Sequence, residues 1–266
     1  MGRPGAFAPV TGDFYMQKYF DINDSGYSVR SLVYCNDIRN IKKMIIFYHG
    51  FGGHKDNRAA ARFAEFILSK YKNTGVLCFD WPAHGDDARS RLMISDCLLY
   101  MDFIFKYVRE RWKVEEFYAY GTSFGGYMIL RYLAEKGNPF QKIALRCPAV
   151  KSYEVIFRNH LSEEEKEKLA KGKDALAGFD RKVKINNAYL EELRAVDLME
   201  LDFMDYADDI LIIHGSEDEI VPIESVQEFA ENNVIECIPI EGADHRFRNP
   251  KQMDLAINLI AKFLMS

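Results

Sequence analysis

Short apolar runs alternate with amphipathic segments along most of the chain from about residue 43 onward. The apolar runs cover residues 43–48, 75–80, 116–120, 142–147, 209–214 and 234–240. Segments with apolar side chains at helical spacing lie between or after them, most clearly at residues 57–72, 92–110 and about 250–265. Apolar strands that alternate with helices predict an α/β fold, with a mostly parallel sheet covered by helices on both faces.

The region before residue 43 has a different pattern. Residues 14–35 contain two runs in which apolar and polar side chains alternate, and Asn23-Asp24-Ser25-Gly26 separates them. A period of two on both sides of a turn-forming sequence is typical of a β-hairpin. We therefore expect an antiparallel hairpin at the edge of the sheet.

Residues 149–205 interrupt the alternation of strands and helices. Within them, Ser162 and Glu165 have the spacing of a helix capping box, and a short polar helix is expected to run toward Gly172. The region is longer than a usual crossover between strands, and long insertions are often functional. We predict a single domain over residues 1–266, with a cap insertion at about 149–205. The alternative is a decorated crossover with no role at a site.

Composition excludes several classes of protein. The chain has 266 residues, of which 48% are hydrophobic and 28% charged, which is typical of a globular domain. The net charge of −5 does not suggest a nucleic-acid partner. The most apolar stretch, residues 92–108, is interrupted by Asp96, Asp102 and Lys106, so it is too short and too charged to span a bilayer.

The cysteines and the N-terminus predict a cellular location. Five cysteines are scattered without a CxxC pair, which indicates reduced thiols and a reducing compartment. The first residues lack the apolar core of a signal peptide. We therefore predict a cytoplasmic protein. A homodimer is one of the assembly states left open.

The clearest candidate for chemistry is a serine between two glycines. Residues 121–126 read Gly-Thr-Ser-Phe-Gly-Gly and lie directly between a predicted strand and a predicted helix. This is the G-x-S-x-G pattern of a nucleophile elbow, in which a strained turn lifts the serine hydroxyl out of the sheet. Ser123 is therefore the candidate nucleophile. The alternative is a tight turn with a buried serine.

A serine hydroxyl needs a base, and the base needs an acid that orients it. His245 follows the last predicted strand and Asp218 follows the fifth, so both are expected at the same sheet edge as Ser123. The chain order Ser, Asp, His is that of α/β-hydrolases. Three neighbouring acids stay open as alternatives to Asp218: Glu217, Glu219 and Asp244.

A tetrahedral intermediate also needs two N–H donors for its oxyanion. We assign one to the backbone of Phe124, directly after the nucleophile, and the other to the backbone of Phe51. The glycine-rich loop at residues 49–54 would let the chain approach the substrate closely. The expected substrate pocket includes Gly50, Gly52, Trp81 and His84. No phosphate-binding glycine motif occurs, and no HExxH motif or cysteine cluster suggests a metal site.

These motifs together resemble a known family. Residues 49–55 (HGFGGHK), 79–86 (FDWPAHGD), 121–126 (GTSFGG), 215–222 (GSEDEIVP) and 242–245 (GADH) are similar to the motif series of α/β-hydrolase serine hydrolases. The closest resemblance is to the bacterial cinnamoyl and feruloyl esterase-like branch, which is also similar to monoacylglycerol lipases and serine aminopeptidase-like hydrolases.

The resemblance implies an eight-stranded, mostly parallel sheet, a cap after the sixth strand and no cofactor. It also implies that Ser123 is the nucleophile, that Asp218 and His245 are its partners, and that Phe51 and Phe124 provide the oxyanion donors. The chain departs from the family pattern at three places: Thr122 where histidine is usual, Phe124 where glutamine is common, and residues 86–89 where a Ser-Asp-Gly-like run is usual.

The predicted activity is hydrolysis of carboxylic esters with small or aromatic acyl groups through an acyl-enzyme intermediate. A small-molecule ester is the expected partner. Alternatives with the same chemistry are a serine peptidase or amidase, a thioesterase and a monoacylglycerol lipase-like hydrolase. A peptidase would need an acidic anchor, for which the insertion offers Glu154, Glu191 and Glu192. A non-catalytic ligand-binding relative is the alternative from a different class.

Overall fold

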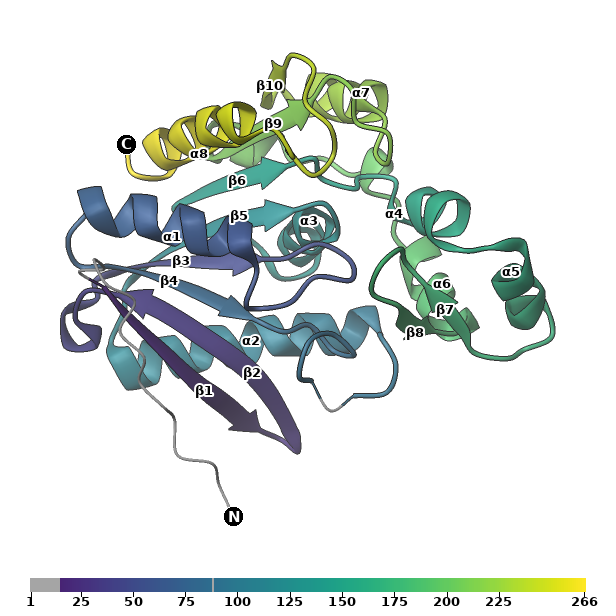
Figure 1. Cartoon of the computed structure of the whole chain (residues 1–266), viewed down its shortest axis with the longest axis horizontal. Coiled ribbons are helices and arrows are strands. Elements are labelled where there is room, and N and C mark those ends of the chain that lie inside the picture. The colour runs from purple at the N-terminus through teal and green to yellow at the C-terminus, as the bar shows by residue number, and fades with distance from the viewer. Residues whose placement is uncertain (1–14, 88) are drawn as a thin grey trace.

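A computed structural model describes residues 15–87 and 89–266 of the chain, and its centre is an eight-stranded sheet (Figure 1). The strand order is β1-β2-β4-β3-β5-β6-β9-β10. In chain order the bounds are β1 (Met16–Asp24), β2 (Tyr27–Cys35), β3 (Lys43–Tyr48), β4 (Thr74–Phe79), β5 (Glu116–Thr122), β6 (Lys142–Arg146), β9 (Ile210–Gly215) and β10 (Glu236–Ile240). All pairs from β4 to β10 are parallel, which confirms the predicted α/β fold class.

The predicted edge hairpin is formed by β1 and β2. The two strands pair antiparallel from Met16–Cys35 to Asp24–Tyr27, and β2 also pairs antiparallel with β4. Ser25 and Gly26 make the turn, and both have positive φ angles, 49° and 79°. A two-residue turn with both φ angles positive matches the right-handed twist of the strands it joins. The hairpin is therefore longer and tighter than the sequence pattern indicated, since Asn23 and Asp24 still belong to the strand.

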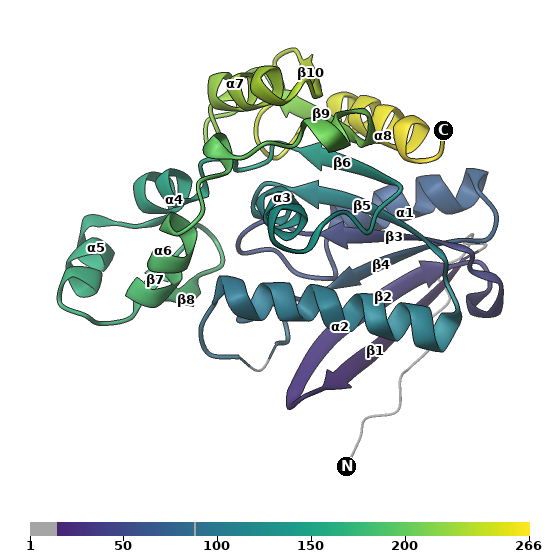
Figure 2. The same cartoon turned by 180° about the vertical axis from the view of Figure 1, so that it is seen from behind.

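Helices cover both faces of the sheet, as Figures 1 and 2 show from opposite sides. On one face lie α1 (Arg58–Lys70) and α8 (Pro250–Leu264); on the other lie α2 (Ile94–Trp112), α3 (Phe124–Lys136) and α7 (Ile223–Asn233). The alternating side chains of β3 divide between them. Ile45 and Phe47 pack with α1 and α8, whereas Met44, Ile46 and Tyr48 pack on the other face. Both faces are buried, which explains why the parallel strands are almost wholly apolar.

The chain between β6 and β9 forms a separate small layer beside the carboxyl ends of the strands (Figure 1). It contains α4 (Ser152–Val155), a π-helical turn at Ile156–His160, α5 (Glu163–Ala170), β7 (Ala175–Ala177), β8 (Val183–Ile185), α6 (Asn187–Arg194) and 3₁₀ turns at Leu198–Glu200 and Met204–Asp209. The predicted polar helix is α5, and Ser162 caps it by accepting a hydrogen bond from the Glu165 N–H. The insertion is tied to α2, because Glu192 accepts a 2.6 Å hydrogen bond from the Ile94 N–H.

Within the described residues, no helix has the length and apolar character needed to cross a membrane. The five cysteines are all unpaired, and four of them are buried. The expectation about a signal peptide rests on the first 14 residues, which lie outside the described part of the chain.

Candidate active site

Ser123 occupies a sharp turn between β5 and α3. Its φ and ψ angles are 51° and −116°, a conformation that non-glycine residues rarely adopt. The turn is held from both sides. The Ser123 N–H donates to the Arg146 carbonyl at 3.0 Å, and the Ser123 carbonyl accepts from Tyr127 and Ala149 at 3.1 and 3.2 Å. Strain of this kind persists only where the surroundings enforce it, and it is common at active sites.

The positions around Ser123 must be glycine, because neighbouring atoms leave no room for a side chain. A Cβ atom on Gly125 would lie 2.0 Å from the Tyr48 carbonyl oxygen. A Cβ atom on Gly121 would lie 2.6 Å from Ile129 Cδ1 and 2.8 Å from the Gly126 nitrogen. The strand and the helix can therefore approach one another closely enough to form the turn only when these positions carry no side chain.

The structure brings His245 and Asp218 into contact. His245 Nδ1 lies 2.7 Å from Asp218 Oδ2, and the Asp218 side chain is fully buried. Because a carboxylate can only accept, Nδ1 is the nitrogen that donates to Asp218, and Nε2 is the ring nitrogen that remains to serve as the base. Of the rival acids, Asp244 pairs with Arg248 at 2.9 Å, and Glu219 accepts a 3.3 Å hydrogen bond from the His245 backbone rather than from the ring.

Asp218 is ionised despite its burial. Burial raises the pKa of this carboxyl, but hydrogen bonds from His214, His245 and the Val221 N–H outweigh it and hold the pKa well below its usual range. Its Oδ1 atom accepts from the Ile220 and Val221 N–H groups at 2.9 and 2.7 Å. The carboxylate is thus fixed in position and charge, as the partner of a catalytic histidine needs to be.

One group of side chains has the composition of a metal site. Ligand atoms of Cys147, His214 and Asp218 lie within 4.8 Å of one another. However, burial and the nearby Asp218 raise the pKa of the Cys147 thiol well above its ordinary value, so the thiolate that a metal needs is not favoured. The Asp218 carboxylate is also already bound by both histidines. These groups are better described as a hydrogen-bonded support for Asp218.

Ser123 and His245 line the same cavity, which has a volume of about 350 Å³. No hydrogen bond joins these two described side chains. Gly50, Phe51 and Gly52 also line the cavity, as predicted for the loop after β3. The insertion also contributes to the lining, with residues that no sequence motif identified: His160, Phe179, Asp180 and Arg181.

Trp81 and His84 lie away from this cavity. The Trp81 side chain has no exposed surface, and its Nε1–H donates to the His49 carbonyl at 2.9 Å. His84 is 3% exposed, and its ring meets the Phe51 ring edge-on at 5.6 Å. Both residues therefore contact the loop that carries Phe51, and neither lines the cavity.

The two residues expected to provide the oxyanion donors are in contact through their side chains. The rings of Phe51 and Phe124 meet edge-on at 5.9 Å, and neither backbone N–H donates to another described residue. The loop before Phe51 is held by His49, whose Nε2 accepts from the Trp81 N–H at 3.3 Å and whose Nδ1 donates to the Gly50 carbonyl at 2.8 Å. Burial lowers the pKa of His49 well below its usual value, so the ring is neutral.

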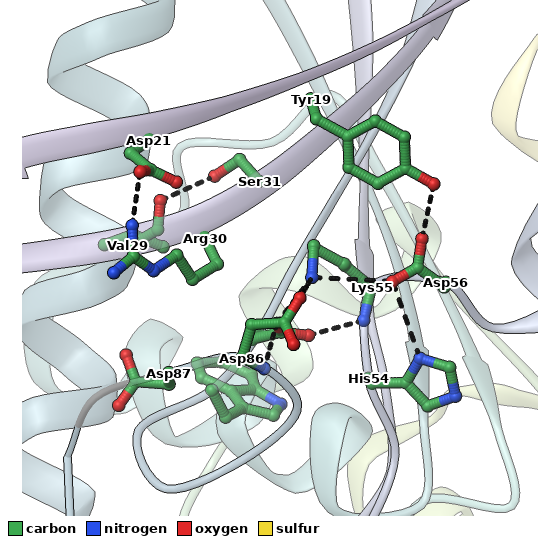
Figure 3. Close-up of polar contacts among 12 residues, drawn as sticks. Tyr19, Asp21, Val29, Arg30, Ser31, His54, Lys55, Asp56, Asp86 and Asp87 are labelled. Atoms are coloured by element: carbon green, nitrogen blue, oxygen red, sulfur yellow. Dashed lines mark hydrogen bonds and ion pairs between the residues drawn. The ribbon is translucent and has the colours of Figure 1, made fainter. Parts of the chain in front are cut away.

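A buried charge cluster fixes the other end of this loop (Figure 3). The Lys55 N–H and Nζ donate to the two oxygens of Asp80 at 2.6 and 3.0 Å, and Nζ also contacts Asp86 and Asp56. From the edge strand, the Tyr19 hydroxyl donates to Asp56 at 2.6 Å. The cluster joins residues 49–57 to residues 80–87 and to β1. Lys55 and Asp80 were not identified from the sequence, although both lie within the motifs that carry the family resemblance.

Comparisons with known proteins identify the family and the fold. Residues 43–187 match the sequence model of a family described as alpha/beta hydrolase fold. Est1E from Butyrivibrio proteoclasticus, solved with ferulic acid bound, is 19% identical, with a TM-score of 0.74 over 92% of this chain and 98% of that one. The Pyrococcus furiosus esterase Pf2001 is 19% identical, with a TM-score of 0.69 over 98% and 96%.

A third solved structure, alpha/beta hydrolase domain-containing protein 10 from mouse, is 16% identical, with a TM-score of 0.69 over 93% of this chain and 98% of that one. No curated protein sequence matches the chain. At these identities the solved structures establish the fold alone, and they agree with the predicted fold class and its eight-stranded sheet. The family match covers more than half of the length of this chain, so the chain belongs to the α/β hydrolase fold family.

Proposed function

We propose that the protein is a serine hydrolase that cleaves carboxylic esters with small or aromatic acyl groups. The observation that carries the proposal is the 2.7 Å contact between His245 and Asp218, in a cavity that Ser123 enters from a strained turn. A nucleophile, a base and an acid that orients the base are the three parts that acyl transfer to a serine requires.

In the proposed reaction, Ser123 Oγ attacks the ester carbonyl carbon while His245 Nε2 takes the hydroxyl proton. The carbonyl oxygen becomes an oxyanion, which the Phe51 and Phe124 N–H groups stabilise. The intermediate then collapses, and the leaving alcohol takes the proton from His245. Water attacks the acyl-enzyme by the same steps, releasing the carboxylic acid and restoring Ser123. The Ser123–His245 hydrogen bond would form on substrate binding, when such contacts commonly tighten.

Three observations support small or aromatic acyl groups. The cavity volume of about 350 Å³ is near the lower end for small-molecule sites. Its apolar wall includes Phe51, Phe179 and Ile220. Est1E, which shares the fold, is known with ferulic acid bound.

We further propose that residues 149–205 act as a cap, since His160, Phe179 and Arg181 line the cavity. We also propose that the enzyme works in the cytoplasm, where unpaired cysteines persist.

A peptidase is less well supported. The candidate anchors for an amino terminus, Glu154, Glu191 and Glu192, do not line the cavity. Glu192 is occupied by the Ile94 N–H. Among the described residues that line the cavity, the only carboxylate is Asp180, which pairs with Arg246 at 3.1 Å.

The proposal is tested with 4-nitrophenyl esters and a fluorophosphonate probe. We expect the probe to label Ser123, Ser123→Ala to lower kcat about 10⁶-fold, and Asp218→Asn to lower it about 10⁴-fold. Ser225→Ala is the control. This half-buried serine does not line the cavity, and its hydroxyl only donates to the Pro222 carbonyl at 2.8 Å in the first turn of α7, so the change should leave kcat unchanged. An aminoacyl-anilide should react far more slowly than the esters. A Ser123→Ala protein with wild-type activity would exclude the mechanism.

A further inference from the structure

Arg146 is a buried cation without a counter-ion beside the proposed nucleophile. It is the last residue of β6, and its carbonyl accepts the Ser123 N–H. The residue is 7% exposed and forms no ion pair with any described residue. Its guanidinium lies 5.2 Å from the centre of the Phe247 ring, and Nη1 lies 3.2 Å from Met253 Sδ. Its Nε is buried without a hydrogen-bond partner.

This environment is unfavourable for a guanidinium as it stands. Arginine stays charged at any ordinary pH, and a buried charge is normally paired and hydrogen-bonded. A thioether is a weak acceptor, and an aromatic face satisfies none of the five N–H groups. The other buried arginine in the described chain, Arg131, is fully engaged by Glu135, Tyr127 and the Glu192 carbonyl. The contrast identifies Arg146 as a cation whose partner is supplied from elsewhere.

The cavity that Arg146 lines is positive. Three arginines contribute to its wall, Arg146, Arg181 and Arg246, against the single carboxylate of Asp180. Asp180 pairs with Arg246, and Arg181 forms no ion pair with a described residue. The whole chain carries a net charge of −5, so this positive region is local to the cavity. A cleft lined by one sign of charge concentrates ligands of the opposite sign.

We propose that the substrate of this enzyme carries an anionic group, a carboxylate or a phosphate, which Arg146 binds while Ser123 attacks the ester carbonyl. Both oxyanions fit the planar fork of a guanidinium. Because Arg146 and Ser123 line the same cavity of about 350 Å³, the anionic group and the scissile bond share this small space, and the substrate is a short ester. This inference rests on the proposed hydrolase function and adds the substrate class to it.

Matched pairs of esters test the proposal. For an anion on the acyl side, 4-nitrophenyl glutarate monoester is compared with 4-nitrophenyl glutaramate. For an anion on the alcohol side, 4-acetoxybenzoate and 4-acetoxyphenyl phosphate are compared with 4-acetoxybenzamide. We expect at least one anionic ester to have a kcat/KM about 10 to 100 times that of its neutral partner, as charge-assisted hydrogen bonds allow. Which arm shows the preference identifies the position and chemistry of the anion.

Arg146→Met should abolish this preference, so that kcat/KM for the preferred anionic ester falls to that of its neutral partner, and methionine preserves the apolar contacts of the side chain. Arg39→Met, at an exposed arginine that does not line the cavity, should leave the preference intact. Thermal unfolding and fluorophosphonate labelling of Ser123 show whether the Arg146→Met protein is folded. If the Arg146→Met protein is not folded, Arg146→Lys replaces it. The ratio of kcat/KM for the anionic ester to that for the neutral ester in the wild type is then a second test, because the proposal requires the wild type to prefer an anionic ester.

The outcomes separate the two proposals. Hydrolysis of neutral esters with labelling of Ser123, but without preference for any anionic ester, overturns the inference and leaves the hydrolase function standing. An equal loss on both members of a pair in Arg146→Met also overturns it, because the role of Arg146 would then be structural. Failure to hydrolyse any ester or to label Ser123 overturns both.

Discussion

His214 Nε2 lies 3.2 Å from Asp218 Oδ2, and both side chains are completely buried. The same nitrogen lies 3.0 Å from the Val221 carbonyl oxygen. Because both neighbours are acceptors, Nε2 carries a proton, and its N–H is shared between the Val221 carbonyl and Asp218 Oδ2. Asp218 Oδ2 therefore receives N–H groups from two histidines, one buried beneath it and one, His245, at the cavity. His214 fixes the carboxylate that in turn orients the proposed base.

Removing this support should slow the reaction without weakening substrate binding. We expect His214→Leu to lower kcat about tenfold, the equivalent of one net hydrogen bond, with little change in KM. His214→Gln, which retains an N–H donor, should recover most of the loss. Steady-state kinetics with 4-nitrophenyl butyrate measure both effects. Equal activity of the leucine and glutamine variants would mean that His214 only fills space.

The contrast between His245 and His214 indicates how much of the site could be predicted from the sequence. His245 and Asp218 could be identified because each follows a strand, in the order that an α/β hydrolase requires. His214 lies inside the apolar run of β9, where a histidine resembles any buried polar residue. The contact of His214 with Asp218 depends on how the loop after β9 folds back on the strand, and no local sequence pattern predicts this.

The fold could be predicted to a similar extent. Buried parallel strands have long apolar runs, so the order of the six parallel strands after residue 43 could be predicted, whereas α7 was not among the predicted helices. The length of the segment between β6 and β9 indicates an insertion, but β7 and β8 have only three residues each, too few for a period of two to be detected. The cavity wall formed by Phe179 and Arg181 depends on where those short strands pack, so these residues were not identified.

The buried pair of Lys55 and Asp80 should contribute strongly to stability. Lys55→Met leaves the Asp80 carboxylate, which has no exposed surface, without its cationic partner. We expect the free energy of unfolding to fall by about 3 kcal/mol, as for other buried ion pairs broken on one side. Urea unfolding at pH 7 measures the change.

Arg62→Met is the matched control for this variant. It breaks an exposed ion pair with Asp254, whose atoms lie 2.6 Å apart, and should lower the free energy of unfolding by less than about 1 kcal/mol. If both variants lost equally little, the Lys55–Asp80 pair would not be the anchor of the loop that carries Phe51.

His84 makes stability depend on pH in a defined window. Burial lowers the pKa of this histidine from 6.5 to about 4. Below pH 6.5 the unfolded chain therefore binds a proton that the folded protein binds only near pH 4, so stability falls as the pH decreases between these values. The lowered pKa of buried His49 acts in the same direction. The lowered pKa of Asp218 does not contribute here, because its stabilisation is lost only below the ordinary value of 3.8.

His84→Phe should make the protein less sensitive to acid, since phenylalanine keeps the ring beside Phe51 and cannot titrate. Between pH 7 and pH 4.5 we expect the wild type to lose about 2 kcal/mol more unfolding free energy than the variant. Urea unfolding curves of both proteins at the two pH values give this difference directly, and any cost of the lost hydrogen bond to the Pro82 carbonyl cancels within each protein. Parallel losses in the two proteins would show that His84 accepts a proton in the folded state, and that its ring is less enclosed than its 3% exposure implies.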